Sequence, residues 1–182
     1  MKRDYLCRPG FRYPLMAALL ALFFIAGALQ EVSAQTDFSG SWKLKDSSGG
    51  PGEMQGLLTN IAPQQMNVSR DGDEMAVEKI TSVGSTGERR TTNEKYDLKG
   101  GVTNNPISNN PRRSTVRWSP DNERMTIRSD MSIDMQGLFF DITQTEVWSL
   151  SDDGKTLRIE MTMSTSMGDM SFNFTYEKSE QK

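Results

Sequence analysis

Apolar and polar residues alternate at every second position through most of the chain after its first 37 residues. In one long segment, for example, Phe140, Ile142, Trp148 and Leu150 share a single phase. This alternation is typical of strands that bury one face and expose the other. The pattern recurs about nine times, in the segments 41–45, 66–69, 75–78, 95–98, 115–118, 124–133, 140–150, 157–163 and 170–177. The periodicity therefore predicts an all-β protein.

Turn residues separate these segments and indicate how the strands connect. Sequences typical of hairpin turns occur at 71–73, 119–123, 152–155 and 166–169. Short strands joined by such turns form a sandwich or a barrel. Because the C-terminal connections are all tight, we expect an antiparallel up-and-down β-barrel of about 8–10 strands. We expect longer loops at 46–56 and 99–110, with a short helix at 53–58.

The first 34 residues have the three parts of a secretory signal peptide. Basic residues precede an apolar run at 15–29, and small residues at 32–34 match a cleavage site. The run has 15 residues, whereas a membrane-spanning helix needs roughly 20. We therefore expect cleavage after Ala34, a periplasmic or secreted product, and one barrel domain at 35–182. An uncleaved signal anchor is the alternative.

The charge of the expected mature chain argues against nucleic acids and membranes as partners. The whole chain has a net charge of −3, and loss of the signal removes four basic and two acidic residues, which leaves −5. A mildly acidic chain with scattered Lys and Arg offers no surface for nucleic acid or anionic lipid. No second apolar run follows the signal, so we expect no stable membrane insertion after cleavage. The sequence identifies no protein partner.

The segment DFSGSWKL at 37–44 resembles the opening of the calycins, which include lipocalins and fatty-acid-binding proteins. Its Phe, Gly, Trp, Lys and Leu match the F-x-G-x-W-K-L opening of the fatty-acid-binding branch. Tyr-Glu-Lys at 176–178 resembles the Y-E-K with which many chains of that branch end. The segment 147–157 is similar to one in small exported bacterial proteins described as lipocalin-like. The resemblance implies a lipocalin-like barrel, with Trp42 as a structural plug at its closed end.

One position departs from this branch and limits what the resemblance implies about a ligand. In fatty-acid-binding proteins, an Arg two residues before the closing Tyr helps to hold the ligand carboxylate. Here Tyr176 is kept, but Phe174 stands at the Arg position. That branch is also intracellular, whereas an export signal is expected here. The resemblance therefore implies a barrel cavity without that carboxylate clamp.

The residue inventory excludes most kinds of catalytic and metal site. The chain has no His, and its single Cys, Cys7, lies within the expected signal. Ser-His-Asp and Cys-His nucleophilic sites are therefore excluded, and the usual zinc and haem ligands are missing. The acidic segment 71–74 lacks the rest of a calcium loop and is expected to be a hairpin turn. We expect no enzyme activity, no cofactor and no metal.

Four polar or charged residues continue the inward phase of predicted strands: Lys79, Glu94, Gln144 and Glu146. Burial of an unpaired charge is very unfavourable. Either these groups pair with one another, or the barrel interior holds water and a ligand. A bulge that shifts the phase, and turns some of them outward, is a third reading.

The inward positions of the C-terminal strands define the ligand-binding residues expected in a hollow barrel. Most are apolar, and two supply polar contacts, which is typical of a site for a small apolar or amphipathic molecule. The predicted ligand-binding residues are Met125, Ile127, Met131, Phe140, Gln144, Glu146, Trp148, Met161, Met163, Phe172 and Tyr176.

Two other functions stay open alongside ligand binding. A barrel that is packed solid would fit a structural or interaction protein of the cell envelope. Alternatively, Met161, Met163, Met167 and Met170 cluster near one hairpin, and thioethers bind Cu(I) without Cys. Period-two spacing already explains most of these residues as core or cavity side chains.

Overall fold

The computed structural model describes residues 34–50, 62–83, 87–107, 110–135 and 138–179. The chain divides into two units, Met1–Ser33 and Ala34–Lys182. The first unit, and with it the predicted signal up to Ser33, lies outside the described residues. Every regular element in the described ranges is a strand, and no helix found there could cross a membrane.

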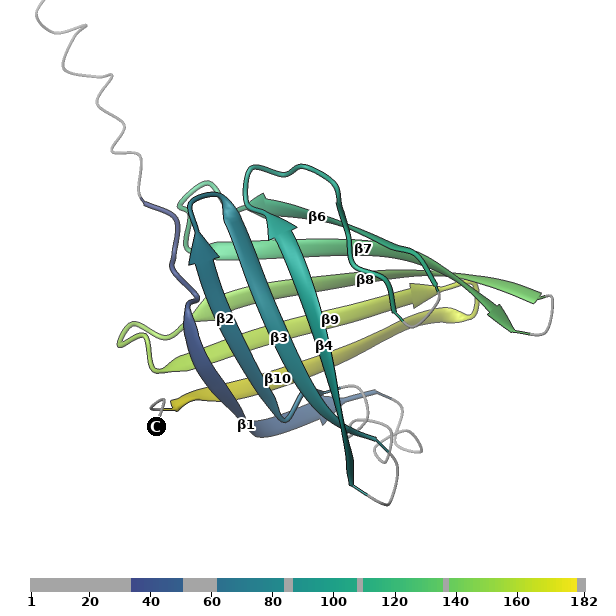
Figure 1. The fold of residues 1–182 in the computed structure, drawn as a ribbon, viewed down its shortest axis with the longest axis horizontal. Coiled ribbons are helices and arrows are strands. Elements are labelled where there is room, and N and C mark those ends of the chain that lie inside the picture. Colours follow the sequence, from purple (N-terminus) through teal and green to yellow (C-terminus); the bar gives the residue numbers. More distant parts are fainter. Residues whose placement is uncertain (1–33, 51–61, 84–86, 108–109, 136–137, 180–182) are drawn as a thin grey trace, which may run out of the picture. The chain divides into compact units, whose positions relative to one another are not determined.

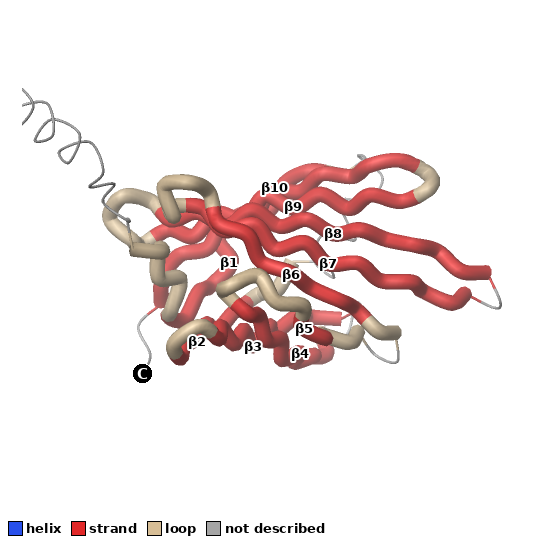
Figure 2. The backbone as a smooth tube through the Cα atoms, turned by 90° about the horizontal axis from the view of Figure 1, so that it is seen from above, coloured by secondary structure: helices blue, strands red, loops and turns tan. Residues whose placement is uncertain are grey.

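The strands of the second unit are β1 (Gly40–Gly49), β2 (Gln65–Asp71), β3 (Glu74–Val83), β4 (Glu88–Asp97), β5 (Thr103–Asn104), β6 (Arg112–Trp118), β7 (Arg124–Met135), β8 (Leu138–Leu150), β9 (Thr156–Thr165) and β10 (Gly168–Ser179). They form one antiparallel sheet in the order β4-β3-β2-β1-β10-β9-β8-β7-β6-β5. The sheet curls so that β2, β3 and β4 face β7 to β10 across a nearly closed barrel (Figures 1 and 2). The predicted fold class, an antiparallel up-and-down barrel, is confirmed.

The first strand is longer than the sequence predicts. A loop was expected from residue 46, but β1 continues to Gly49. A bulge at Lys45 shifts the register, after which Asp46 pairs with Thr175 and Gly49 with Phe172 on β10. Periodicity misses this extension because backbone pairing does not require apolar side chains. The predicted helix at 53–58 lies outside the described residues.

The second predicted loop, 99–110, also contains strand pairing that the sequence did not reveal. Within it, β5 pairs with β6, and Ile107 forms an isolated bridge with Asn110. Elements this short carry too few residues for a period to be recognised.

The seam between β4 and β6 is bridged by the side chain of Asn105. Its Oδ1 accepts a hydrogen bond from the backbone N–H of Lys95 at 2.8 Å, and its Nδ2 donates to the Lys95 carbonyl oxygen at 2.9 Å. The buried amide thus satisfies the two backbone groups that a neighbouring strand would pair. The Asn105 backbone N–H donates to Arg112 on β6, so this residue ties the two sides together.

One end of the barrel, called the base below, is filled by Phe38, Trp42, Trp118 and Trp148. Trp42 has no exposed surface, and its Nε1 donates to the Phe38 carbonyl oxygen at 2.9 Å. The Phe38 ring stacks on Trp118 at 6.0 Å and meets the Trp148 ring edge-on at 5.8 Å. Gly40, where β1 enters the base, has a φ of 140°, which side chains rarely adopt. Trp42 is therefore the plug that the resemblance implies.

Candidate functional site

Beyond the base, the barrel encloses a cavity of about 520 Å³. A volume of this size is typical of sites for small organic molecules. Its lining includes Arg90, which is exposed, so the cavity extends to the protein surface on that side. The barrel is therefore packed at one end and hollow further along.

The lining of the cavity differs between its two sides. Strands β7 to β10 supply an apolar wall of Met131, Ile133, Ile142, Ile159, Met161, Met163 and Phe174, with the polar groups of Gln144, Glu146 and Tyr176 at its edge toward the base. Strands β3, β4 and β6 supply a polar wall of Lys79, Thr81, Arg90, Thr92, Glu94 and Arg112. A molecule that fills this space would meet hydrocarbon on one side and hydrogen-bonding groups on the other.

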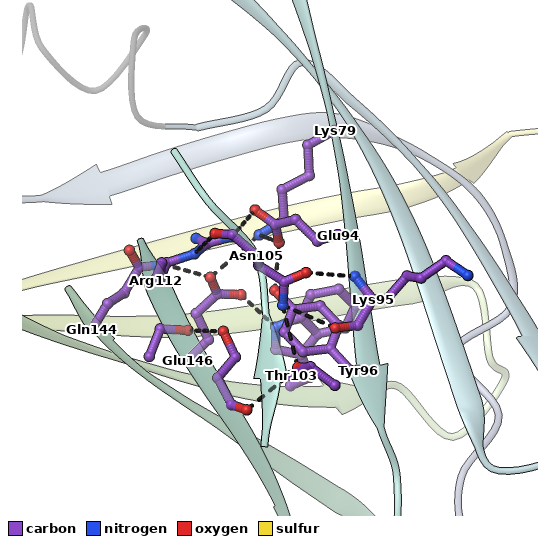
Figure 3. Close-up of polar contacts among 12 residues, drawn as sticks. Lys79, Glu94, Lys95, Tyr96, Thr103, Asn105, Arg112, Gln144 and Glu146 are labelled. Atoms are coloured by element: carbon purple, nitrogen blue, oxygen red, sulfur yellow. Dashed lines mark hydrogen bonds and ion pairs between the residues drawn. The ribbon is translucent and has the colours of Figure 1, made fainter. Parts of the chain in front are cut away.

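Four buried charged residues meet at the boundary between the two walls, and we call them the charged cluster: Lys79, Glu94, Arg112 and Glu146 (Figure 3). The Nζ of Lys79 lies 2.9 Å from Glu94 Oε2 and 3.4 Å from Glu146 Oε1. Arg112 forms an ion pair with the other Glu94 oxygen. The side chains come from β3, β4, β6 and β8, so the cluster links both walls.

Neutral groups complete the hydrogen bonding of the two carboxylates. The Tyr96 hydroxyl donates to Glu94. Gln144 Nε2 donates to one oxygen of Glu146 at 2.6 Å, and Trp148 Nε1 donates to the other at 2.8 Å. Buried charges are tolerated only with such partners. The structure shows mutual pairing of these groups, which also line the hollow part of the barrel, so the outward-facing reading is wrong.

The pairing outweighs burial in setting the pKa values of Lys79 and Glu94. Burial alone would lower the pKa of Lys79, but Glu146 and Glu94 raise it well above its usual value. Burial would likewise raise the pKa of Glu94, but Lys79 and Arg112 lower it to about 2. At neutral pH, Lys79 is therefore a cation and Glu94 a carboxylate, in direct contact.

Six of the predicted ligand-binding residues line the cavity: Met131, Gln144, Glu146, Met161, Met163 and Tyr176. The other five do not: Met125, Ile127, Phe140, Trp148 and Phe172. Four of these five are buried in the core, and Phe140 is half-buried near the end of the β7–β8 hairpin. They share the inward phase but lie nearer the base or beyond the hollow part. Periodicity gives the side of the sheet and not the height in the barrel. Their role as ligand contacts stays a prediction.

Sequence reasoning missed several lining residues, of which Arg112 matters most. Arg112 lies two positions before Ser114, which lies two before Val116, so all three share one inward phase. The signal was present, but a basic residue at a strand end is normally assigned to solvent. Met66 and Ile159 were in recognised strands but were not included in the site.

The thioethers proposed for Cu(I) are not gathered at one place. Met161 and Met163 line the cavity, whereas Met167 is 84% exposed at the turn between β9 and β10. In the part of the chain that the structure describes, no group of three His, Cys, Asp or Glu could hold a metal.

Comparison with known proteins identifies the architecture. No family model matches the sequence, and no curated protein matches it. The structure is similar to the crystal structure of zebrafish ileal bile acid-binding protein complexed with cholic acid, with a TM-score of 0.51 and 14% sequence identity. The match covers 78% of this chain and 98% of that chain. The fold is calycin-like. At this identity, the likeness concerns the fold alone.

Proposed function

We propose that this chain is an exported binding protein, and not an enzyme, that holds a small apolar or amphipathic molecule inside its barrel. The observation that carries the proposal is the cavity of about 520 Å³ between an apolar and a polar wall. The bile acid-binding protein with the same fold, complexed with cholic acid, supports such a use of the architecture. The expected signal peptide supports export.

Native mass spectrometry tests binding and export together. The full-length chain is expressed in a bacterial host and purified from the periplasm and the medium. We expect a polypeptide that begins at Gln35 and carries an additional organic mass. A full-length mass in the membrane fraction would contradict cleavage and favour the signal-anchor alternative, whereas a full-length chain in the cytoplasm would contradict export. A bare polypeptide in all gentle preparations would favour the solid-barrel alternative.

A pair of substitutions on β4 tests where the molecule binds. Thr92 lines the cavity, whereas Thr91 on the same strand is exposed. Thr92→Trp fills part of the cavity and is expected to weaken binding of the uncharged fluorophore N-phenyl-naphthylamine at least roughly tenfold, a loss of about 1.4 kcal/mol. Thr91→Trp adds the same side chain outside and is expected to leave binding unchanged. Equal effects of the two substitutions would contradict a site inside the barrel.

A further inference from the structure

The hydroxyl of Tyr176 is buried without a hydrogen-bond partner. Among the described residues, it is the buried side-chain oxygen or nitrogen for which no partner is found. The residue has no exposed surface and lies on β10 in the lining of the cavity. An unsatisfied buried polar group destabilises the folded protein, because the group has given up its hydrogen bonds to water without replacement. A group that entered the cavity and bonded this hydroxyl would therefore remove an existing penalty.

Tyr176 is positioned on β10 toward the base end of the cavity. In the β-ladders, Tyr176 is opposite Leu44 on β1 and Leu157 on β9, whereas Phe174 lies one step closer to the open side. Burial raises the pKa of Tyr176 above its usual range, so the group stays a neutral hydroxyl at physiological pH. It can therefore donate to an oxygen of a bound molecule, or accept from one.

The charged cluster beside this hydroxyl is already balanced. Its two cations face its two carboxylates, and the ion pairs among them are all buried. A carboxylate that entered here would lose its water and meet Glu94 and Glu146 as like charges, while the cations are already engaged. Arg90 borders the cavity as well, but at its exposed side, where water screens its charge.

We propose, building on the function proposed above, that the bound molecule is uncharged and amphipathic, with a hydroxyl or carbonyl oxygen on the Tyr176 hydroxyl. Its hydrocarbon part lies against the apolar wall formed by Met131, Ile159, Met161 and Phe174. The balanced cluster disfavours a carboxylate that has the same length and shape as this uncharged molecule.

Two probes of equal chain length, dodecanol and dodecanoate, test this preference by displacement of N-phenyl-naphthylamine at neutral pH. In the unmodified protein, we expect dodecanol to bind at least roughly tenfold more tightly. Tyr176→Phe is expected to weaken dodecanol about fivefold, within the usual range for one neutral hydrogen bond. Ser129→Ala is the control, because it also removes a buried hydroxyl, but one that bonds Ser114 and does not line the cavity.

Glu146→Gln tests the electrostatic part separately. The substitution keeps the shape and one of the two acceptor oxygens but leaves the cluster with one excess cation. We expect dodecanoate to gain about tenfold in affinity, while dodecanol changes little.

Outcomes against the inference are distinct from failure of the proposed function. Dodecanoate binding as tightly as dodecanol to the unmodified protein would overturn the inference and leave the binding function intact. An equal response of dodecanol to Tyr176→Phe and Ser129→Ala would overturn the role of Tyr176. Failure of both the fluorophore and the two probes to bind would overturn the proposed function and the inference with it.

Discussion

The base and the cavity of this barrel are built by the same strands but differ in how the interior is filled. At the base, Trp42 and its aromatic neighbours fill the interior with large side chains and little charge. Further along, the interior contains the charged cluster and an unfilled volume of about 520 Å³. The two regions meet at Trp148, whose ring packs on Phe38 while its Nε1 donates to Glu146.

This difference teaches where stability and binding reside. Dense apolar packing is the main source of folding free energy, and a cavity forgoes part of it. A buried ionic cluster adds little net stability, because desolvation offsets the attraction between the charges. The base is therefore expected to dominate stability, and the hollow region to dominate ligand choice.

The largest effect is expected from Trp42→Ala in the base. Loss of a fully buried Trp typically costs about 3–5 kcal/mol, because a large void replaces its contacts. We expect a fall of this size in the free energy of unfolding, measured by urea denaturation, with fluorophore affinity of the folded fraction unchanged. Phe139→Ala, on a side chain that is 73% exposed, is the control and should change stability by less than about 0.5 kcal/mol. A large loss of affinity in Trp42→Ala would show that the two regions are not separable.

Glu94→Gln is expected to have the next largest effect. It removes the carboxylate that pairs with Arg112 and leaves Lys79 with the carboxylate of Glu146. Removal of one partner of a buried ion pair costs about 3–5 kcal/mol. Because the Gln side chain still offers one oxygen that accepts hydrogen bonds, we expect a cost at the lower end of this range. Urea denaturation near pH 7 measures it.

The same substitution predicts a change in acid stability. The pKa of Glu94 is about 2 in the folded state against an ordinary value of 4.5. The lower folded value means that its contribution is fully present above about pH 4.5 and is lost as the pH falls toward 2. The stability gap between the unmodified protein and Glu94→Gln should therefore narrow near pH 3. A constant gap across this range would contradict an ionised Glu94 as the source of the effect.

Much of this architecture could be predicted from the sequence, because a half-buried strand imposes a period of two. The inward positions of Lys79, Glu94 and Glu146 were visible for that reason, whereas the plug at Trp42 was implied by the resemblance of its segment to the calycin opening. The extension of β1 beyond the bulge at Lys45 was not visible, since its polar residues pair through the backbone alone. The alternation within one segment indicates which side chains are buried, whereas strand pairing depends on two segments together.

The candidate site could be predicted only in part, for a related reason. Phase places Met125 and Met161 on the same interior, yet only Met161 borders the cavity. Their positions along the barrel axis depend on the register between strands, and the sequence of one strand does not specify that register. The seam at Asn105 and the partner of Glu94 across it, Arg112, likewise depend on how the two ends of the sheet meet.

The smallest predicted effect compares these two methionines directly. Both side chains are buried, but Met125 pairs in register with Trp118 and Trp148 near the base, whereas Met161 faces the cavity. Met→Ala in a packed core costs about 2–5 kcal/mol. Met161 has neighbours on fewer sides and loses less dispersion energy, so we expect Met161→Ala to cost about 1 kcal/mol less than Met125→Ala.

A bound molecule should reduce this difference, because it contacts Met161 and leaves Met125 untouched. Urea denaturation of both variants, with and without saturating dodecanol, measures the two gaps. Stabilisation by the ligand should be smaller for Met161→Ala than for the unmodified protein, and unchanged for Met125→Ala. Equal costs for the two substitutions without ligand would mean that Met161 is as closely packed as Met125. The interior would then be solid in solution, and an interaction protein of the cell envelope would become the better account of this fold.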